Sequence, residues 1–461
     1  MGFRTIKIHL ETLTIKGTKK MRRLVLTAAT FASLFFASHI QAQESGASDF
    51  KPTTNIYGYV FGDYYLKTHS DSLSRGGGNV QYRGVPNRFD AFQVRRAYLG
   101  FEQGITKDIS ATVLLADEAG PSLANTGTNL DASGYNSMYL KFGYLKWNNI
   151  FKNSSLNIGQ FMTCSYATAN NSEQLMGYRV IERTIMDMHN NDNVSDLGLS
   201  LQGNLWTQSM AKDSLKPTFI GYIAQVGNFA GAKPETDKFK KVRGNLFVST
   251  LQQKLVIGLY ADFNQVKLNP INQSTTTLKA YADYKTDWFN IGFEAFTQRN
   301  KNGDSYKATI GAKDSTIADG VQQGLSIFLC GRIIKHRLNY YARIDFYNPD
   351  ASFKKSNFYT VTNTGSDATS LAKQAVSNQL SYEAKTFYRQ TFYTFGFDYT
   401  PMSRIHILPN IWCNKYTTMM GSVGTKELTA NQKKGFDFVP RITAYYIFNA
   451  NKKVANNGMD N

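Results

Sequence analysis

The sequence is poor in proline, with 10 residues among 461, and it contains only three cysteines. Cys164, Cys330 and Cys413 are odd in number and far apart, so they predict isolated small residues and no disulfide framework. No HExxH motif, paired-cysteine motif or glycine-rich phosphate loop before a helix is present. We therefore expect no enzyme, no metal and no cofactor, although a triad assembled only in space stays an open alternative.

Long hydrophobic runs are also missing after residue 42, so the sequence predicts no transmembrane helix in the rest of the chain. Met21 opens a basic segment, the apolar run 24–38 is too short to span a bilayer, and Ala42 ends a plausible cleavage site. We expect residues 1–42 to be an upstream extension plus signal peptide with Met21 as initiator. The remaining boundaries predict a periplasmic segment at 43–54, a barrel at 55–448 and a tail at 449–461.

Acidic residues are fewer than basic ones, and the whole chain carries a formal charge of +18. A basic balance suits nucleic acid, a membrane surface or a path for anions. Export makes nucleic acid an improbable partner. An exported chain without a membrane helix is periplasmic, secreted or a β-barrel.

Aromatic residues are abundant, with 27 Tyr and 31 Phe, and one terminal stretch shows how they are arranged. In residues 436–448, apolar side chains such as Ile442 and Tyr446 alternate with a mixed set such as Arg441 and Thr443. Period-two alternation is typical of a strand with a different environment on each face. A strand facing lipid needs a partner on both edges, because unpaired backbone groups are costly in hydrocarbon. Residues 55–66 are the expected partner that closes the ring.

The same alternation recurs along the chain and predicts sixteen antiparallel strands. They cover about 55–66, 88–102, 107–117, 136–148, 155–163, 194–205, 217–227, 239–250, 253–263, 276–286, 288–298, 321–331, 336–347, 387–400, 403–415 and 436–448. The connections alternate between long and short, as in outer-membrane barrels with long outer loops and short periplasmic turns. Trp147, Trp206 and Trp288 fall beside short turns, where an interfacial aromatic girdle is expected. The predicted fold is all-β: a transmembrane antiparallel barrel of sixteen strands.

The third long connection, 164–193, has apolar residues at helical spacing between Leu175 and Met188. We expect this loop to fold into the barrel and narrow the pore. Its acidic residues are Glu173, Glu182, Asp187 and Asp192, and it also carries His189. Its basic residues Arg179 and Arg183 are four apart and can share a helix face. The alternative is that Glu182 and Arg183 only fix the loop to the wall.

Basic side chains on the presumed inward parity are the candidate selectivity residues, because Arg and Lys in a pore favour anions. Adjacent Arg95 and Arg96 cannot both face inward in a regular strand, so we expect a bulge or a position near the rim for one of them. The alternative role is a cross-strand ion pair with an acid such as Asp63, Asp262, Asp283, Glu294, Asp345 or Asp398. The candidates are Arg95, Lys141, Lys241, Arg243, Lys279, Arg337, Arg343, Arg389 and Arg441.

Several short motifs resemble the phosphate-selective porin O and P type of outer-membrane porins, within the wider group of sixteen-stranded porins. They are Phe92–Glu102, Tyr139–Leu145 leading to Leu156–Phe161, Ile181–Thr184 in the long third loop, and Gly396–Pro401. Met162-Thr163-Cys164-Ser165 departs from the Lys and Pro that the family usually has there. The resemblance implies a homotrimer in the outer membrane of a Gram-negative bacterium, in contact with the lipid bilayer and lipopolysaccharide.

Together these features predict passive diffusion of small hydrophilic solutes, with a preference for anions. One alternative is a substrate-specific channel, for phosphate, dicarboxylates or sugars. The other is a structural or adhesion barrel that does not conduct.

Overall fold

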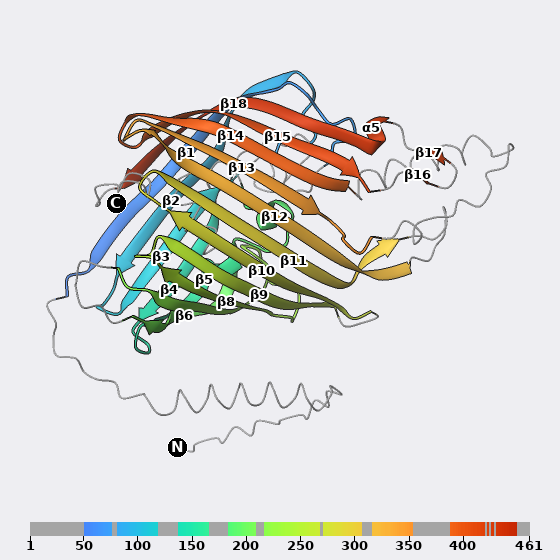
Figure 1. Cartoon of the computed structure of the whole chain (residues 1–461). Coiled ribbons are helices and arrows are strands. Elements are labelled where there is room, and N and C mark those ends of the chain that lie inside the picture. The colour runs from blue at the N-terminus through green and yellow to red at the C-terminus, as the bar shows by residue number, and fades with distance from the viewer. Residues whose placement is uncertain are drawn as a thin grey trace, which may run out of the picture. The chain divides into compact units, whose positions relative to one another are not determined.

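The computed structural model describes residues 50–75, 81–118, 137–165, 183–208, 216–267, 271–306, 316–353, 388–419, 422–423, 426–427 and 430–449. Sixteen strands close into one antiparallel barrel (Figure 1). They are β1 (Thr53–Lys67), β2 (Phe89–Gly104), β3 (Ile109–Asp117), β4 (Tyr139–Asn148), β5 (Ser154–Met162), β6 (Ser195–Thr207), β7 (Phe219–Gly227), β8 (Lys241–Thr250), β9 (Leu255–Lys267), β10 (Gln273–Lys285), β11 (Phe289–Tyr306), β12 (Thr316–Ile334), β13 (Leu338–Asn348), β14 (Tyr388–Met402), β15 (Ile405–Thr418) and β18 (Lys434–Asn449). The predicted fold class and strand number are confirmed.

Smaller elements lie in the connections. A four-residue helix, α3 (Ile185–Met188), precedes β6, and another, α5 (Ala430–Lys433), precedes β18. The two-residue strands β16 (Ser422–Val423) and β17 (Lys426–Glu427) pair with each other outside the barrel sheet. No described helix is both long enough and apolar enough to cross a membrane. Residues Met1–Lys51 form a unit separate from Pro52–Asn461, and residues 50 and 51 are its described part.

The barrel closes between its first and last strands, as the alternating pattern predicts. The register runs antiparallel from Tyr57 opposite Asn449 to Tyr65 opposite Arg441. On β18, Ile442 and Tyr446 are about half exposed, whereas Arg441 and Thr443, on either side of Ile442, are buried. The apolar set therefore faces outward and the mixed set faces the interior, the arrangement that a barrel in lipid requires.

The sixteen barrel strands show the same two faces, and the tryptophans mark one rim of the outer face. Trp147, Trp206 and Trp288 are all exposed and lie next to the turns after β4, β6 and β10. Trp412 is fully buried and points inward from β15. Three tryptophans at the short-turn end match an interfacial girdle, and the fourth belongs to the interior.

Short turns lie at one end of the barrel, including 286–288, 335–337 and 403–404, and the longer connections lie at the other. The connection between β11 and β12 is shorter than predicted, because these strands extend to Tyr306 and Thr316. This extension carries polar residues on both faces, and Arg299 pairs with Asp319 across it at 2.6 Å. Alternation ends there although backbone pairing continues, which is why sequence patterning places the strand ends too early.

Candidate functional site

Two bulges place basic side chains inside the barrel. In β2, Phe61 pairs with Arg96 while Gly62 pairs with Val94, so Arg95 is the extra residue. Arg95 and Arg96 are both buried. Neighbours in a regular strand point to opposite faces, so only a bulge allows both side chains to face the interior. In β4, the register skips Lys141 in the same way, and both Lys141 and Phe142 are buried. The predicted bulge at the arginine pair is confirmed.

Most of the predicted inward cations are paired with a carboxylate on the inner face of the barrel. The partners are Asp63 for Arg95 at 2.8 Å, Asp262 for Lys241 at 3.0 Å, Glu294 for Lys279 at 3.0 Å, Asp345 for Arg343 at 2.6 Å, and Glu118 for Lys141. Arg441 instead donates hydrogen bonds to the side-chain oxygens of Asn410 and, at 3.2 Å, of Gln81. Buried carboxylates outnumber buried cations among the described residues. The buried charges alone therefore do not favour anions.

Two of the predicted positions are wrong. Arg389 is exposed and shares its parity on β14 with Phe395 and Phe397, whereas Gln390 and Phe392 face inward. Arg389 thus lies on the outer face, at the end of the strand where a long side chain can reach the lipid headgroups. Arg337 is exposed in the turn between β12 and β13 and is not part of the wall.

The connection between β5 and β6 is fixed at both ends by a buried charge cluster. Asp192 accepts hydrogen bonds from Arg243 at 2.8 Å, Lys241 at 3.1 Å and Ser165 Oγ at 2.5 Å. Arg243 also pairs with Asp196 at 2.7 Å, and Lys279 donates to the Ser165 carbonyl at 2.6 Å. Burial would raise the pKa of Asp192, but Arg243 and Lys241 outweigh it and hold that pKa well below its usual range. We call this set the charged anchor.

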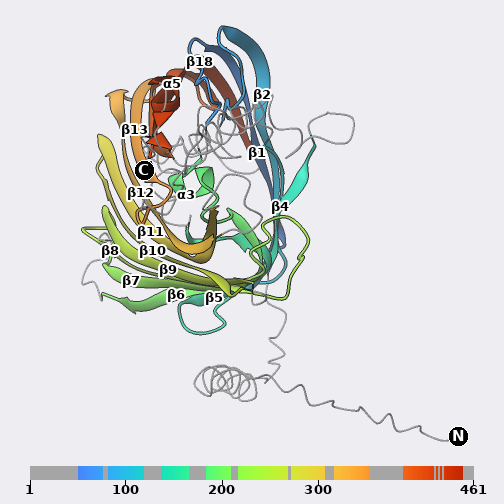
Figure 2. The same cartoon turned by 90° about the vertical axis from the view of Figure 1, so that its right-hand side faces the viewer.

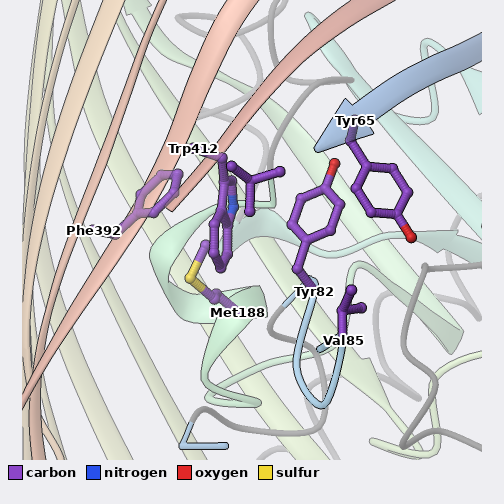
Figure 3. Close-up of a cluster of buried hydrophobic side chains, with 7 residues drawn as sticks. Tyr65, Tyr82, Val85, Met188, Phe392 and Trp412 are labelled. Atoms are coloured by element: carbon purple, nitrogen blue, oxygen red, sulfur yellow. The ribbon is translucent and has the colours of Figure 1, made fainter. Parts of the chain in front are cut away.

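A second contact holds the same connection through apolar side chains. Thr184 caps α3 by accepting from the Asp187 amide at 3.3 Å, and Figure 2 shows α3 within the ring of strands. Met188 at the end of α3 joins a fully covered cluster from several strands and from residues 81–88, shown in Figure 3. Its members are Tyr65, Tyr82, Val85, Met188, Phe392, Trp412 and Val439. We call this set the apolar anchor.

His189 follows α3 and stacks on Tyr347, with ring centroids 3.4 Å apart and planes at 4°. Burial, and next the positive charge of Arg343, lower the pKa of His189 to about 3. His189 is therefore neutral when the loop is docked at neutral pH, and protonation opposes docking.

Arg183 meets a group of charges at the start of this contact. Its guanidinium pairs with Asp187 at 3.4 Å, and Arg343 donates to its carbonyl at 2.7 Å. Glu118 lies near Arg183, Arg96 and Lys141, and these cations hold its pKa well below the usual range although burial acts the other way. Asp187 is buried in α3, whereas Glu173, Arg179 and Glu182 lie outside the described residues.

Sequence patterning did not predict the buried ion pairs in and next to the connection after β1. Asp71 and Arg75 form a fully buried ion pair at 2.8 Å, and Arg75 also donates to Thr418 Oγ1 at 3.1 Å. Lys67 pairs with Asp437 at 2.9 Å and donates to the Tyr82 carbonyl at 2.8 Å. These residues have no strand or helix period, so only the i, i+4 acid–base spacing of Asp71 and Arg75 offered a signal.

Sequence patterning also missed a set of inward-facing charged residues at the short-turn end of the barrel. Among the described strand residues at this end, the inward-facing charged side chains that contact water are Lys146, Lys285 and Arg332, which are half-buried, and Glu102, which is exposed. Exposed neighbours such as Trp147, Tyr284 and Ile333 fix their parity. Alternation with those apolar residues was visible in the sequence and is the signal that identifies them. Charges that contact water can act on a passing solute, and three of these four are basic.

No model of a known protein family matches the sequence, and no curated protein matches it. Among solved structures, the outer membrane channel DcaP of Acinetobacter baumannii is similar, with a TM-score of 0.52 and 12% identity, over 87% of this chain and 99% of that one. The anion-selective porin from Comamonas acidovorans gives a TM-score of 0.49 and 9% identity, over 86% of this chain and 100% of that one. OprB of Pseudomonas putida gives 0.48 and 9%, over 86% and 94%. The likeness to DcaP supports the barrel fold.

Proposed function

We propose that the protein is an outer-membrane porin that lets small hydrophilic solutes diffuse passively across the membrane. The observation that carries this proposal is the closed barrel of sixteen strands with an apolar outside and a polar, charged inside. A barrel of this strand number is wide enough for an aqueous channel. Long connections outside and short turns on the periplasmic side are the arrangement of bacterial outer-membrane barrels.

The proposed solute preference is for anions. Fully buried ion pairs hold the wall and contribute little to a passing charge, because their fields largely cancel. Lys146, Lys285 and Arg332 stay partly exposed on the inner face, and Arg183 in the loop keeps 28% of its side chain exposed. Against them stand Glu102, which is exposed, and Glu118, which is largely buried. The cations that contact water thus support an anion preference, as a basic pore wall does in general.

The remaining expectations belong to the same proposal. The signal peptide at 1–42, the homotrimer and the lipopolysaccharide-rich lipid environment follow from the sequence and its resemblance. The phosphate-selective type, and a channel for phosphate, dicarboxylates or sugars, depend on short motifs alone.

The test is recording from single channels of the full-length protein in planar bilayers. We expect discrete conductance steps and, in a salt gradient, a reversal potential of the sign given by anion preference. Folded protein that inserts without steps would favour a structural barrel, and a cation-selective reversal potential would overturn the anion preference. If deletion of residues 170–188 leaves the conductance unchanged, the loop does not narrow the pore.

A further inference from the structure

The outer face of the barrel carries an apolar groove across β12, β13, β14, β15 and β18. The groove is open to the outside and has a volume of about 600 Å³, and its walls include Ile327, Ile344, Phe395 and Phe438. Ala342 and Cys413 lie between these larger side chains, and their small size leaves the hollow. A hollow on a surface that faces hydrocarbon accommodates acyl chains.

Three basic side chains, Arg389, Lys415 and Lys434, face outward at the end of the groove nearer the long connections. Arg389 on β14 and Lys434 on β18 lie in one row across the sheet, because both pair with Thr417 on the strand between them, β15. Lys415 lies two residues below Thr417 and places its ammonium 5.3 Å from the Tyr393 ring centroid. From strand spacing, Arg389 and Lys434 are about 10 Å apart, and Lys415 is about 7 Å below their row.

The outward faces of these strands carry no compensating acid. On the outward parity of β13, β14, β15 and β18, whose residues are all described, the charged side chains are Arg389, Lys415 and Lys434. All three are exposed. Arg299, an outward cation on β11, is different because Asp319 neutralises it at 2.6 Å. Long basic side chains at the edge of the hydrocarbon extend to the headgroup level, where positive charge attracts anionic headgroups.

We propose that this face binds a phosphorylated lipid of the outer leaflet, with its phosphates on Arg389, Lys415 and Lys434 and its acyl chains in the groove. Basic clusters next to an apolar surface recognise anionic headgroups in this way. A second copy of this chain in a twofold contact is a poorer occupant, because three unneutralised cations would then meet three more. A homotrimer would pair different patches, and crosslinking of two copies tests that case. The site rests on the proposed outer-membrane orientation, in which the long connections face outward.

The test uses full-length protein in detergent micelles, titrated with diphosphorylated lipid A and, separately, with phosphatidylglycerol, with bound lipid counted by native mass spectrometry. The triple variant R389Q/K415Q/K434Q removes the cations. The matched control K107Q/K254Q/K335Q removes three exposed lysines from the short turns at the opposite end. A third variant, A342F, fills the groove and leaves the cations in place. Each cation is expected to contribute about fivefold in affinity.

We expect the triple variant to bind lipid A at least tenfold more weakly, the control to bind it as the wild type does, and A342F to lose affinity as well. Unchanged binding in the triple variant would overturn the proposal, as would equal affinity for phosphatidylglycerol. A response to A342F as small as that of the control would mean that only phosphate is bound, which also contradicts the lipid site. Crosslinking of two copies through cysteines placed on β14 would assign the face to a protein interface instead.

Channel recordings separate this result from the proposed function. The triple variant should retain wild-type conductance, because its side chains lie outside the pore. Loss of lipid binding with conductance retained supports the lipid site. Absence of conductance in the wild type would remove the porin proposal and leave the lipid measurement standing.

Discussion

The two contacts that hold the connection between β5 and β6 have opposite chemistry. In the charged anchor, Asp192 joins Lys241, Arg243, Ser165 and Tyr260, with the ion-paired side chains fully buried. In the apolar anchor, Met188 packs among Trp412, Phe392 and Tyr82. Breaking a buried ion pair leaves an uncompensated charge, whereas trimming an apolar contact leaves a cavity that can relax. The first contact should therefore be the less tolerant of substitution.

The largest effect is expected for Asp192→Asn. Removing this carboxylate leaves the buried charges of Lys241 and Arg243 only partly neutralised. Loss of one member of a buried ion pair destabilises the folded state by about 3–5 kcal/mol. We expect trypsin cleavage after Arg183 to become at least a hundredfold faster, as measured by mass spectrometry of the folded protein. Asp287→Asn, in an exposed turn, is the control and should cleave at the wild-type rate. Equal rates for Asp192→Asn and the wild type would show that the charged anchor does not hold the loop.

Met188→Ala should have a smaller effect. Loss of a buried Met side chain costs about 2–3 kcal/mol where the surroundings relax in part. The same cleavage assay should show an increase of tens of fold, while Met138→Ala, which is half exposed, should show none. A larger effect for Met188→Ala than for Asp192→Asn would reverse the ranking of the two anchors.

Acid should loosen the docked loop in two pH windows, one set by His189 next to α3 and one by Asp192 in the charged anchor. His189 has a pKa of about 3 in the folded protein and about 6.5 when unfolded, so the unfolded state binds more protons between these values. Loop docking should therefore weaken as pH falls from 6.5 toward 3, and His189→Gln should remove this dependence. The lowered pKa of Asp192 adds stability that is fully present above pH 4 and lost only below it. A wild-type cleavage rate that is constant between pH 7.5 and 5 would contradict the assignment to His189.

The smallest effect concerns selectivity at the short-turn end, away from both anchors. Replacing Lys285 and Arg332 by Gln should move the reversal potential in a salt gradient toward cation preference and leave the cleavage rate after Arg183 unchanged. Exposed charges interact with ions by less than about 1 kcal/mol each, so the shift should be a few millivolts to tens of millivolts. The exposed turn pair Lys107→Gln and Lys335→Gln is the control. No shift in the double variant would return the selectivity role to the residues nearer the loop.

Sequence patterning was sufficient for the fold because each strand has only two faces and the membrane sorts them. The alternation of Arg441, Ile442 and Tyr446 already identifies a strand and shows which of its faces is apolar. Patterning placed Lys141 correctly in the interior but did not predict the bulge there, and it failed where both faces are polar, in the extension of β11 and β12.

The candidate site was harder to predict, because its partners come together only in the folded chain. Asp192 and Arg243 are 51 residues apart, and Met188 meets Trp412 from the far end of the sequence. Arg389 was assigned to the wrong face for a related reason. A lone charge near a strand end is compatible with water inside the barrel and with headgroups outside it, and only the register separates the two.

We propose that the two anchors together hold a loop that narrows the pore. The most direct measurement is the single-channel conductance of the double variant D192N/M188A beside that of each single variant and the wild type. A docked loop predicts that conductance rises in each single variant and most in the double variant. Identical conductance in all four proteins, with the barrel folded and inserted, would contradict the claim.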